Sequence, residues 1–345
     1  MKLSDFKYNL PKTAIAKFPV EPRDSARLMV LDRKEETIEH KTFADLPDYL
    51  SKGDVLVYNE TKVMQARLYG FKERTNAKIE VFVLRELNAE ENIWDVIVDP
   101  ARKVRIGNRI YFNDNLWCEV IDNTTSRGRT VRFNSDSDDI YKEIEKIGLT
   151  PLPPYIKRDV VEADREDYQT VFAKEDGSVA APTAGLHFTP DLIKKIKKKG
   201  IKVAPVILHI GLGTFRPVEV EDLTKHRMDS EYFDIPDESA EAINKAITAK
   251  KRVVVVGTST TRALESSVTA EGFVKPNFGW TDKFIFPPYE FRIVRQLVTN
   301  FHTPESTLLM LTSAFGGYDF TMKAYKKAMK EKYRFLSYGD AMMIL

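Results

Sequence analysis

Residues 253–268 read VVVVGTSTTRALESSV, and this stretch indicates the fold class. The four valines predict a strand, because a short run of β-branched apolar residues is a strand signal. Small polar residues at 257–261 predict a loop, and RALESSV predicts a helix that follows it. A buried strand that leads into a helix is typical of an α/β domain with a mixed, largely parallel sheet.

The same alternation of short apolar runs and helical runs extends from Pro151 to the C-terminus. Thr189 as N-cap, Pro190 at the first helical position and Gly200 as a stop predict a helix over LIKKIKKK. Thr303 and Pro304 predict the start of another helix, over ESTLLMLTSAF, and an amphipathic helix is expected at 318–332 before the apolar end AMMIL.

Residues 54–133 show a different pattern, with short alternating or β-branched runs and no helix between them. Six or seven strands of this kind predict a small barrel; the runs are VLVYN, QARLYGF, AKIEVFVLREL, IWDVIVD, RIYF, WCEVID and RTVRF. The first 50 residues hold one expected strand, LMVLD at 28–32, and a short helix near 43–50, too little for a domain. We therefore predict an α/β domain of residues 1–58 plus 151–345 that carries an inserted all-β barrel domain of residues 59–150.

Composition and residue spacing exclude several classes of protein and several kinds of site. The single cysteine, Cys118, cannot form an internal disulfide, a Cys-rich zinc site or a Cys-held iron–sulfur cluster, and no two of the five histidines have metal-ligand spacing. The N-terminus lacks a signal-peptide core, and no apolar run approaches the roughly 20 residues that span a bilayer. We expect a cytoplasmic protein without a bound metal, and the net charge of +2 means that a nucleic acid would be met only by local basic patches.

Two loops are candidates for ligand binding. Residues 211–214, GLGT, follow an apolar strand, where α/β sheets usually hold ligands, but a tight turn without a ligand explains them equally. Arg216 stands where a dinucleotide fingerprint needs glycine, so NAD is rejected. Residues 257–260, GTST, could hold a carboxylate or phosphate with hydroxyls and free N–H groups, or could simply cap a helix.

The histidines and the clustered basic residues each allow a functional and a structural interpretation. His209 and His302 lie beside expected loops and could act as general bases or as structural residues, and His187 has the same two interpretations. Basic residues that could contact phosphates, or could be solvated surface, lie on one helix and in the barrel: Lys194, Lys195, Lys197, Lys198, Lys199, and Arg102, Lys103, Arg105, Arg109, Arg127, Arg129, Arg132.

Taken in order, several segments resemble the motifs of one enzyme family, the S-adenosylmethionine:tRNA ribosyltransferase-isomerases of queuosine biosynthesis. The resemblance covers nearly the whole chain. The matching segments are NETKVMQARL (59–68), LPPYIKR (152–158), DYQTVFA (167–173), VAAPTAGLHFT (179–189), LHIGLGTFRPV (208–218), VGTSTTRALES (256–266), TNFHTPESTLLML (299–311) and YRFLSYGDAM (333–342).

The resemblance implies a two-domain transferase that moves the ribosyl part of S-adenosylmethionine onto 7-aminomethyl-7-deazaguanine at the tRNA wobble position. It rearranges the ribose to give epoxyqueuosine and releases adenine and methionine. S-adenosylmethionine is then a consumed co-substrate and no other cofactor is expected. The partner is tRNA, no membrane is involved, and we expect a monomer.

Such chemistry needs proton transfer and polar groups that hold the ribose and the methionine carboxylate. On positions that match the family motifs, we assign acid–base work to His209, His302, His187 and His226. We assign substrate binding to Thr183, Gly211, Gly213, Thr214, Arg216, Thr258, Ser259, Thr260, Arg262 and Asn300.

Four positions depart from the family patterns. Asp229 replaces the second histidine of H-x-M-H-S-E, Phe286 replaces the tyrosine and Pro288 the glycine of T-x-I-F-I-Y-P-G, and Gln65 replaces a proline; Pro288 also removes an N–H donor. Two alternative functions therefore stay open. One is a catalytically silent tRNA-binding relative, which releases nothing from S-adenosylmethionine, and the other is a methyltransferase, which releases S-adenosylhomocysteine.

Overall fold

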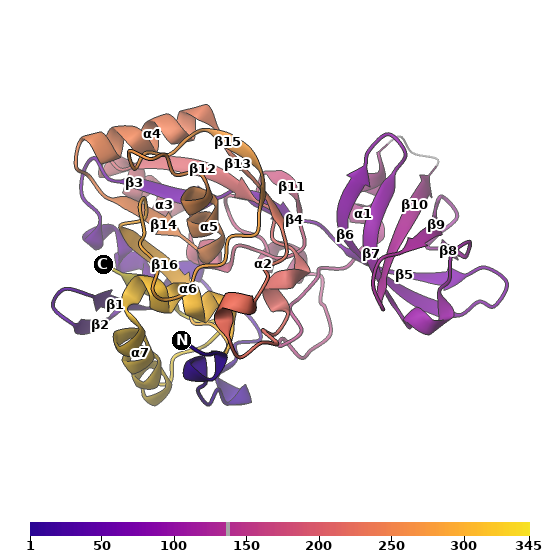
Figure 1. Cartoon of the computed structure of the whole chain (residues 1–345), viewed down its shortest axis with the longest axis horizontal. Coiled ribbons are helices and arrows are strands. Elements are labelled where there is room, and N and C mark those ends of the chain that lie inside the picture. The colour runs from indigo at the N-terminus through magenta and orange to yellow at the C-terminus, as the bar shows by residue number, and fades with distance from the viewer. Residues whose placement is uncertain (136–138) are drawn as a thin grey trace.

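The computed structural model describes residues 1–135 and 139–345, apart from the side chains of Thr214 and Phe215. Figure 1 shows a large α/β body that holds both termini and a smaller β-barrel at one end of the molecule. The two parts are joined by extended segments, so the barrel stands clear of most of the body.

The body is built on a nine-stranded sheet. In spatial order its strands are β15 (Asn277–Thr281), β13 (Glu231–Ile235), β12 (Lys202–Leu208), β3 (Val55–Asn59), β14 (Val253–Val256), β16 (Gln296–Asn300), β17 (Ala341–Ile344), β1 (Arg27–Asp32) and β2 (Thr37–Thr42). The central strands β12, β3, β14 and β16 are parallel, and the outer pairs are antiparallel except β1 with β17. The predicted α/β class with a mixed sheet is confirmed, and the parallel part is its centre.

The alternation of side chains along β14 explains how the four valines hold two layers of helices. Val253 and Val255 belong to one buried cluster, whereas Val254 and Val256 belong to another, because successive side chains point to opposite faces. The first cluster includes apolar residues of α4 (Asp237–Thr248), α5 (Thr258–Ser266), α6 (Thr307–Gly316) and α7 (Tyr318–Lys330). The second includes Leu192 and Ile196 of α3 (Pro190–Lys198). Every residue of β14 is therefore buried.

The barrel closes in the order β10-β7-β6-β5-β8-β9. Its strands are β5 (Arg67–Lys72), β6 (Lys78–Asn88), β7 (Ile93–Asp99), β8 (Arg109–Tyr111), β9 (Leu116–Asn123) and β10 (Gly128–Ser135), and α1 (Ile140–Ile147) packs against their core. The barrel itself is confirmed, but the run VLVYN is β3 of the large sheet and contributes no barrel strand. The division at residues 58 and 150 stays a prediction.

Short elements connect these two parts. β4 (Thr61–Val63) pairs in parallel with β11 (Glu175–Ser178) in a separate two-stranded sheet, and α2 (Asp164–Asp167) is a single turn. The remaining helices are 3-10 turns: η1 (Leu3–Phe6), η2 (Lys12–Ala14), η3 (Arg23–Ser25), η4 (Phe43–Tyr49), η5 (Ala101–Lys103), η6 (Thr183–His187), η7 (Leu212–Phe215) and η8 (Leu223–Lys225). Within the described residues, no helix has the length and apolar character to span a bilayer.

Helix starts show where the sequence patterns were right and wrong. The Thr189 hydroxyl accepts from the Leu192 N–H, so the predicted cap of α3 is confirmed. The expected loop at 257–261 is wrong, because α5 begins at Thr258 and the small polar residues form its first turn. The start expected at Thr303 is also wrong: the Ser306 hydroxyl caps α6 by accepting from the Leu309 N–H, three residues further on.

Candidate active site

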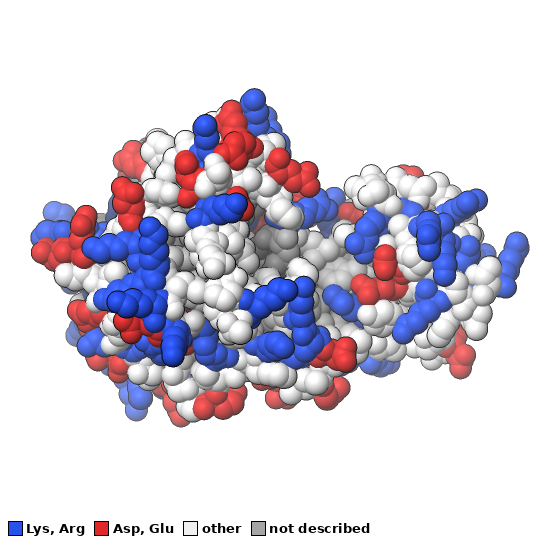
Figure 2. Space-filling view, turned by 90° about the horizontal axis from the view of Figure 1, so that it is seen from below, with Lys and Arg blue, Asp and Glu red and all other residues white. Residues whose placement is uncertain are grey.

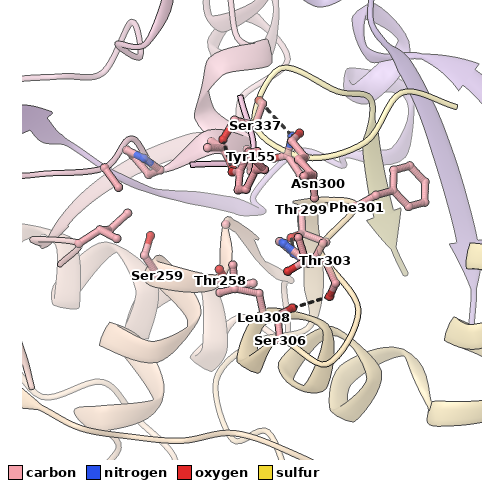
Figure 3. A pocket seen from close by; sticks show the side chains of 18 of the residues that line it. Tyr155, Thr258, Ser259, Thr299, Asn300, Phe301, Thr303, Ser306, Leu308 and Ser337 are labelled. Carbon is pink, nitrogen blue, oxygen red and sulfur yellow. Dashed lines mark hydrogen bonds between the residues drawn. The ribbon is translucent and has the colours of Figure 1, made fainter. Parts of the chain in front are cut away.

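A cavity of about 300 Å³ lies at the edge of the sheet where the parallel strands end. Ile210 beyond β12, Gly257 beyond β14 and the segment beyond β16 line it, and η6 contributes Thr183. The carboxyl ends of parallel strands share one edge, which is where open α/β sheets bind ligands. Figure 3 shows Thr258 and Ser259 facing Tyr155 and Ser337 across this space.

Seven of the predicted site residues meet in this cavity although they come from four separate motifs. They are Thr183, Arg216, Thr258, Ser259, Arg262, Asn300 and His302. The tertiary structure thus brings together residues up to 119 positions apart in the chain, from 183 to 302.

The first turn of α5 forms one wall. Gly257 has φ of +91°, which glycine adopts without strain, and this turn starts the helix directly at the end of β14. Thr258 and Ser259 line the cavity, and the Ser259 hydroxyl accepts from the Asn59 amide at 3.1 Å. The Thr260 hydroxyl instead donates to the Val256 carbonyl at 2.6 Å, so this predicted binding residue is buried beneath the wall.

A buried ion pair crosses the next part of the wall. Arg262 and Glu231 are 5% and 4% exposed, and the guanidinium donates directly to the Glu231 carboxylate. The same arginine donates to the carbonyls of Thr281 and Lys283, and the other Glu231 oxygen accepts from the Gly211 N–H at 2.9 Å. The positive charge of Arg262 is therefore already balanced by Glu231 before any ligand binds.

His302 lies on the opposite wall in a fully enclosed setting. Its Nε2 is 2.8 Å from the Thr299 hydroxyl, and its backbone N–H donates to the Tyr325 hydroxyl at 3.0 Å. Burial lowers the pKa of His302 from the usual 6.5 to about 3. The imidazole is therefore neutral at pH 7 and is a weak proton acceptor.

His187 and Asn300 form a pair behind this wall. The Asn300 amide nitrogen donates to His187 Nε2 at 3.2 Å and to the Leu336 carbonyl at 3.1 Å. Burial, and secondarily the charges of Arg334 and Arg23, lower the pKa of His187 to about 3. Asn300 lines the cavity and its Oδ1 is buried without a hydrogen-bond partner among the described residues, so a ligand hydroxyl could donate to it.

Three of the four predicted histidines do not line the cavity: His187 lies behind its wall, and His209 and His226 lie elsewhere. His209 Nδ1 is 2.7 Å from the Thr61 hydroxyl, and its ring stacks on Tyr232. His226 packs edge-on against Phe284 and lines a separate hollow. Burial lowers the pKa of both rings. The predicted cluster of four acid–base histidines is thus spread over several places, with His302 alone of the four on the cavity wall.

The glycine loop after β12 forms a short 3-10 turn, η7, next to the cavity. A Cβ on Gly213 would lie 2.5 Å from an Asp229 carboxylate oxygen, so this glycine allows a close approach. Arg216 lines the cavity and forms an ion pair of 3.1 Å with Asp229. Asp229, which replaces a histidine of the family pattern, therefore holds Arg216 in the cavity wall. The side chain of Thr214 lies outside the described part of the structure.

Two further departures, Gln65 and Pro288, and one basic residue of the predicted patch are placed as follows. The buried Gln65 side chain accepts from the Thr150 hydroxyl at 2.9 Å, and Pro288 follows a cis peptide bond. Arg129, predicted as part of a basic surface patch, is 7% exposed and donates to barrel carbonyls, among them that of Val104. Its inclusion in the patch is wrong, because a guanidinium that meets several carbonyls inside the barrel cannot face phosphate.

Some lining residues were missed by the sequence analysis. Tyr155 and Ser337 share a hydrogen bond of 2.7 Å, Thr299 holds His302, and Glu231 holds Arg262. All four lie in or beside segments already matched to family motifs. Each of these motifs contains a polar side chain that the sequence makes visible. The spacing of the motifs does not show which of these side chains face the same cavity.

Comparison with known proteins agrees with this geometry. A family model described as queuosine biosynthesis protein matches residues 3–344. The S-adenosylmethionine:tRNA ribosyltransferase-isomerases of Chloroherpeton thalassium and Cytophaga hutchinsonii are 61% and 59% identical, each alignment covering 100% of both chains. The crystal structure of an S-adenosylmethionine tRNA ribosyltransferase from Thermotoga maritima is 38% identical, with a TM-score of 0.57, and the match covers 99% of this chain and 100% of that one.

The match spans the α/β body and the barrel together, and it includes every segment that lines the cavity. This chain belongs to the queuosine biosynthesis protein family.

Proposed function

We propose that this chain is an S-adenosylmethionine:tRNA ribosyltransferase-isomerase that acts on 7-aminomethyl-7-deazaguanine at the tRNA wobble position. It transfers and rearranges the ribosyl part of S-adenosylmethionine to give epoxyqueuosine, with release of adenine and methionine. The observation that carries this proposal is the single cavity into which motifs 179–189, 208–218, 256–266 and 299–311 place their polar side chains. We further propose that it acts as a cytoplasmic monomer, with S-adenosylmethionine as a consumed co-substrate and no other cofactor.

The methionine carboxylate is best placed at the first turn of α5. The N–H groups of a helix's first turn have no partner within the helix, and the helix dipole favours an anion there. Thr258 and Ser259 add two hydroxyls at the same place. Arg262 is a less suitable partner for the carboxylate, because Glu231 already neutralises it.

The ribose hydroxyls are best placed near Asn300 and the Arg262–Glu231 pair. Asn300 Oδ1 offers an unused acceptor, and the Glu231 carboxylate is held by two donors that fix its position. An acceptor held rigidly in a buried site costs little reorganisation when it binds a hydroxyl.

Proton transfer falls to His302 in this proposal. The sulfonium of S-adenosylmethionine makes the neighbouring C5′ protons acidic, and departing adenine needs a proton. Because burial keeps the pKa of His302 near 3, its imidazolium is a strong acid, and the part that fits it best in this proposal is to pass a proton to departing adenine. A proton that the ring accepts would therefore be passed on readily to a stronger base such as adenine.

Basic side chains of both structural parts support tRNA binding. Figure 2 shows Lys and Arg side chains on the body and on the barrel, on either side of the junction between them. Exposed Arg102, Lys103 and Arg105 follow β7 on the barrel. Phosphate contacts of this kind position a nucleic acid without reading its sequence.

The test is a reaction of the pure protein with S-adenosylmethionine and tRNA that carries 7-aminomethyl-7-deazaguanine, followed by chromatography and mass analysis. Equal amounts of adenine, methionine and an epoxyqueuosine nucleoside are expected. S-adenosylhomocysteine would indicate a methyltransferase, and tRNA binding without adenine would indicate a silent relative. The relatives' names give no support to the silent alternative.

A further inference from the structure

The most exposed aromatic side chains among the described residues lie on β15, at the edge of the large sheet. Phe278 is 71% exposed and Trp280 is 56% exposed. Neither belongs to the hydrophobic clusters formed by the described residues. Two large apolar rings held in water cost solvation free energy, so their place calls for a ligand or partner.

Trp280 is also a point where the barrel approaches the body. The guanidinium of Arg85, on barrel strand β6, lies 5.5 Å from the centre of the Trp280 ring. Arg85 in turn lies 3.7 Å from the Asp95 carboxylate of β7. Aromatic rings, together with arginines that add cation–π contacts, are the groups with which proteins bind unpaired nucleobases.

Strand pairing connects this ring to the wall of the cavity. Trp280 is directly opposite Tyr232, and the two rings meet edge to face at 5.8 Å. The neighbouring pair is Thr281 opposite Glu231; because successive side chains of a strand point to opposite faces, Glu231 lines the cavity from the other face of the sheet edge than Trp280 and Tyr232. Arg262 fixes both strands, since it binds the Glu231 carboxylate and the Thr281 carbonyl.

The barrel side makes a second connection to the cavity. Burial raises the pKa of the Asp95 carboxyl, which contacts Arg85, and the charges of Arg85 and Arg216 act against that rise; Arg216 lines the cavity. Barrel strands β6 and β7 therefore carry side chains that interact with Trp280 on one hand and with a residue of the cavity wall on the other.

We propose that Trp280, Phe278 and Arg85 form a stacking platform for an unpaired nucleobase of the tRNA substrate, next to the base that enters the cavity. The proposal rests on the proposed function. A base that enters an enclosed cavity must leave its stack, and its neighbours then lose a stacking partner. Aromatic side chains replace that partner in the recognition of single-stranded RNA loops.

Kinetics and binding with the full chain test the platform. We expect Trp280→Ala to weaken tRNA binding between about fivefold and a hundredfold and to raise KM for tRNA, with KM for S-adenosylmethionine unchanged. Trp280→Phe keeps a flat ring and should stay within about threefold of wild type. Phe278→Ala removes a ring that is 71% exposed, so the variant should fold normally and still weaken tRNA binding.

Phe71→Ala is the matched control, because Phe71 is 49% exposed on the outer face of the barrel strand β5. It should leave tRNA binding unchanged. Intrinsic fluorescence gives a direct readout: tRNA should quench the Trp280 emission in wild type, and Trp280→Phe should lose that part of the quenching while Trp94 and Trp117 remain.

Wild-type tRNA affinity in both Trp280→Ala and Phe278→Ala would overturn the platform. A change in oligomeric state in these variants, with tRNA affinity retained, would instead assign the edge strand to self-association and would equally overturn it. Failure of the proposed function is distinguishable, because the wild-type protein would then release no adenine from S-adenosylmethionine with any tRNA.

Discussion

At the scale of single residues, burial separates histidines that look alike in the sequence. His302 and His209 both follow apolar strands, yet His302 lines the cavity and His209 lies against Thr61 and Tyr232 outside it. A side chain can act as a general acid or base only if it lies within hydrogen-bond reach of the proton that is transferred, so its position is judged before its pKa. The structure therefore favours His302 for the acid–base role, whereas His209 fits a structural role.

This difference gives a direct prediction. His302→Ala should lower kcat by about a hundredfold or more, because it removes a group next to the reacting atoms. His209→Ala should keep kcat within about tenfold. Adenine release at saturating substrates measures both, with circular dichroism as the check on folding, and equal losses in the two variants would contradict the assignment.

The two fully buried histidines also predict how stability depends on pH. Unfolded His187 and His302 take up protons near pH 6.5, whereas the folded protein holds both rings neutral until a pH of about 3. The unfolded state thus binds more protons between these values, so stability is complete above pH 6.5 and falls as the pH drops. The slope is up to about 1.4 kcal/mol per pH unit for each ring.

Urea unfolding between pH 7.5 and 4.5 measures this dependence. His302→Gln should remove about half of the histidine contribution to the slope, because His187 remains. An unchanged slope in the variant would show that His302 is not buried in its neutral form.

At the scale of elements, the junction of β14 and α5 decides the shape of the cavity. Gly257 at φ of +91° lets the strand turn directly into the helix, so the helix N-terminus with Thr258 and Ser259 faces the ligand space. A residue with a Cβ at this φ is strained, although a Cβ there would meet atoms only at 3.8 Å or more.

Gly257→Ala should therefore cost about 1–2 kcal/mol of unfolding free energy and raise KM for S-adenosylmethionine. Gly272→Ala is a matched control, with φ of +83° and open space around the position. It should cost a similar free energy and leave KM for S-adenosylmethionine unchanged. Urea unfolding and steady-state kinetics measure both effects; if both variants raise this KM equally, Gly257 has no particular role in shaping the site.

At the scale of the whole molecule, the proposed tRNA site depends on the barrel and the body together. Basic side chains lie on both parts in the view of Figure 2, and Arg85 and Trp280 bring the two parts into contact. A net charge of +2 means that binding of a polyanion depends on these local groups and not on overall attraction.

The affinity for tRNA should therefore fall steeply with salt, with log Kd rising linearly in log salt concentration, because each phosphate contact releases condensed counterions. Arg105→Gln should reduce that slope by roughly one contact if Arg105 meets a phosphate. Filter binding at several salt concentrations measures this. A salt-independent affinity would exclude the basic surface as the docking site.

The sequence was most informative where a pattern is local. The valine run, the Thr189 cap and the alternating barrel runs each predicted an element correctly, because burial on one or two faces and capping leave a signal within a few residues. The boundaries between neighbouring elements were predicted less well. The sequence of Thr258–Thr261 fits a loop or a first helical turn, and only the packing of α5 on the sheet decides for the helix.

The sequence by itself determined the family, the α/β class and a set of polar motif residues, because motif matches and periodicity need no knowledge of distance. Only the tertiary structure decided that His302 and Arg216 share a cavity while His209 and Thr260 do not, and that Arg129 is inside the barrel. It also decided that Glu231 neutralises Arg262. These facts depend on contacts between segments far apart in the chain, and the chain's path through the sheet sets those contacts.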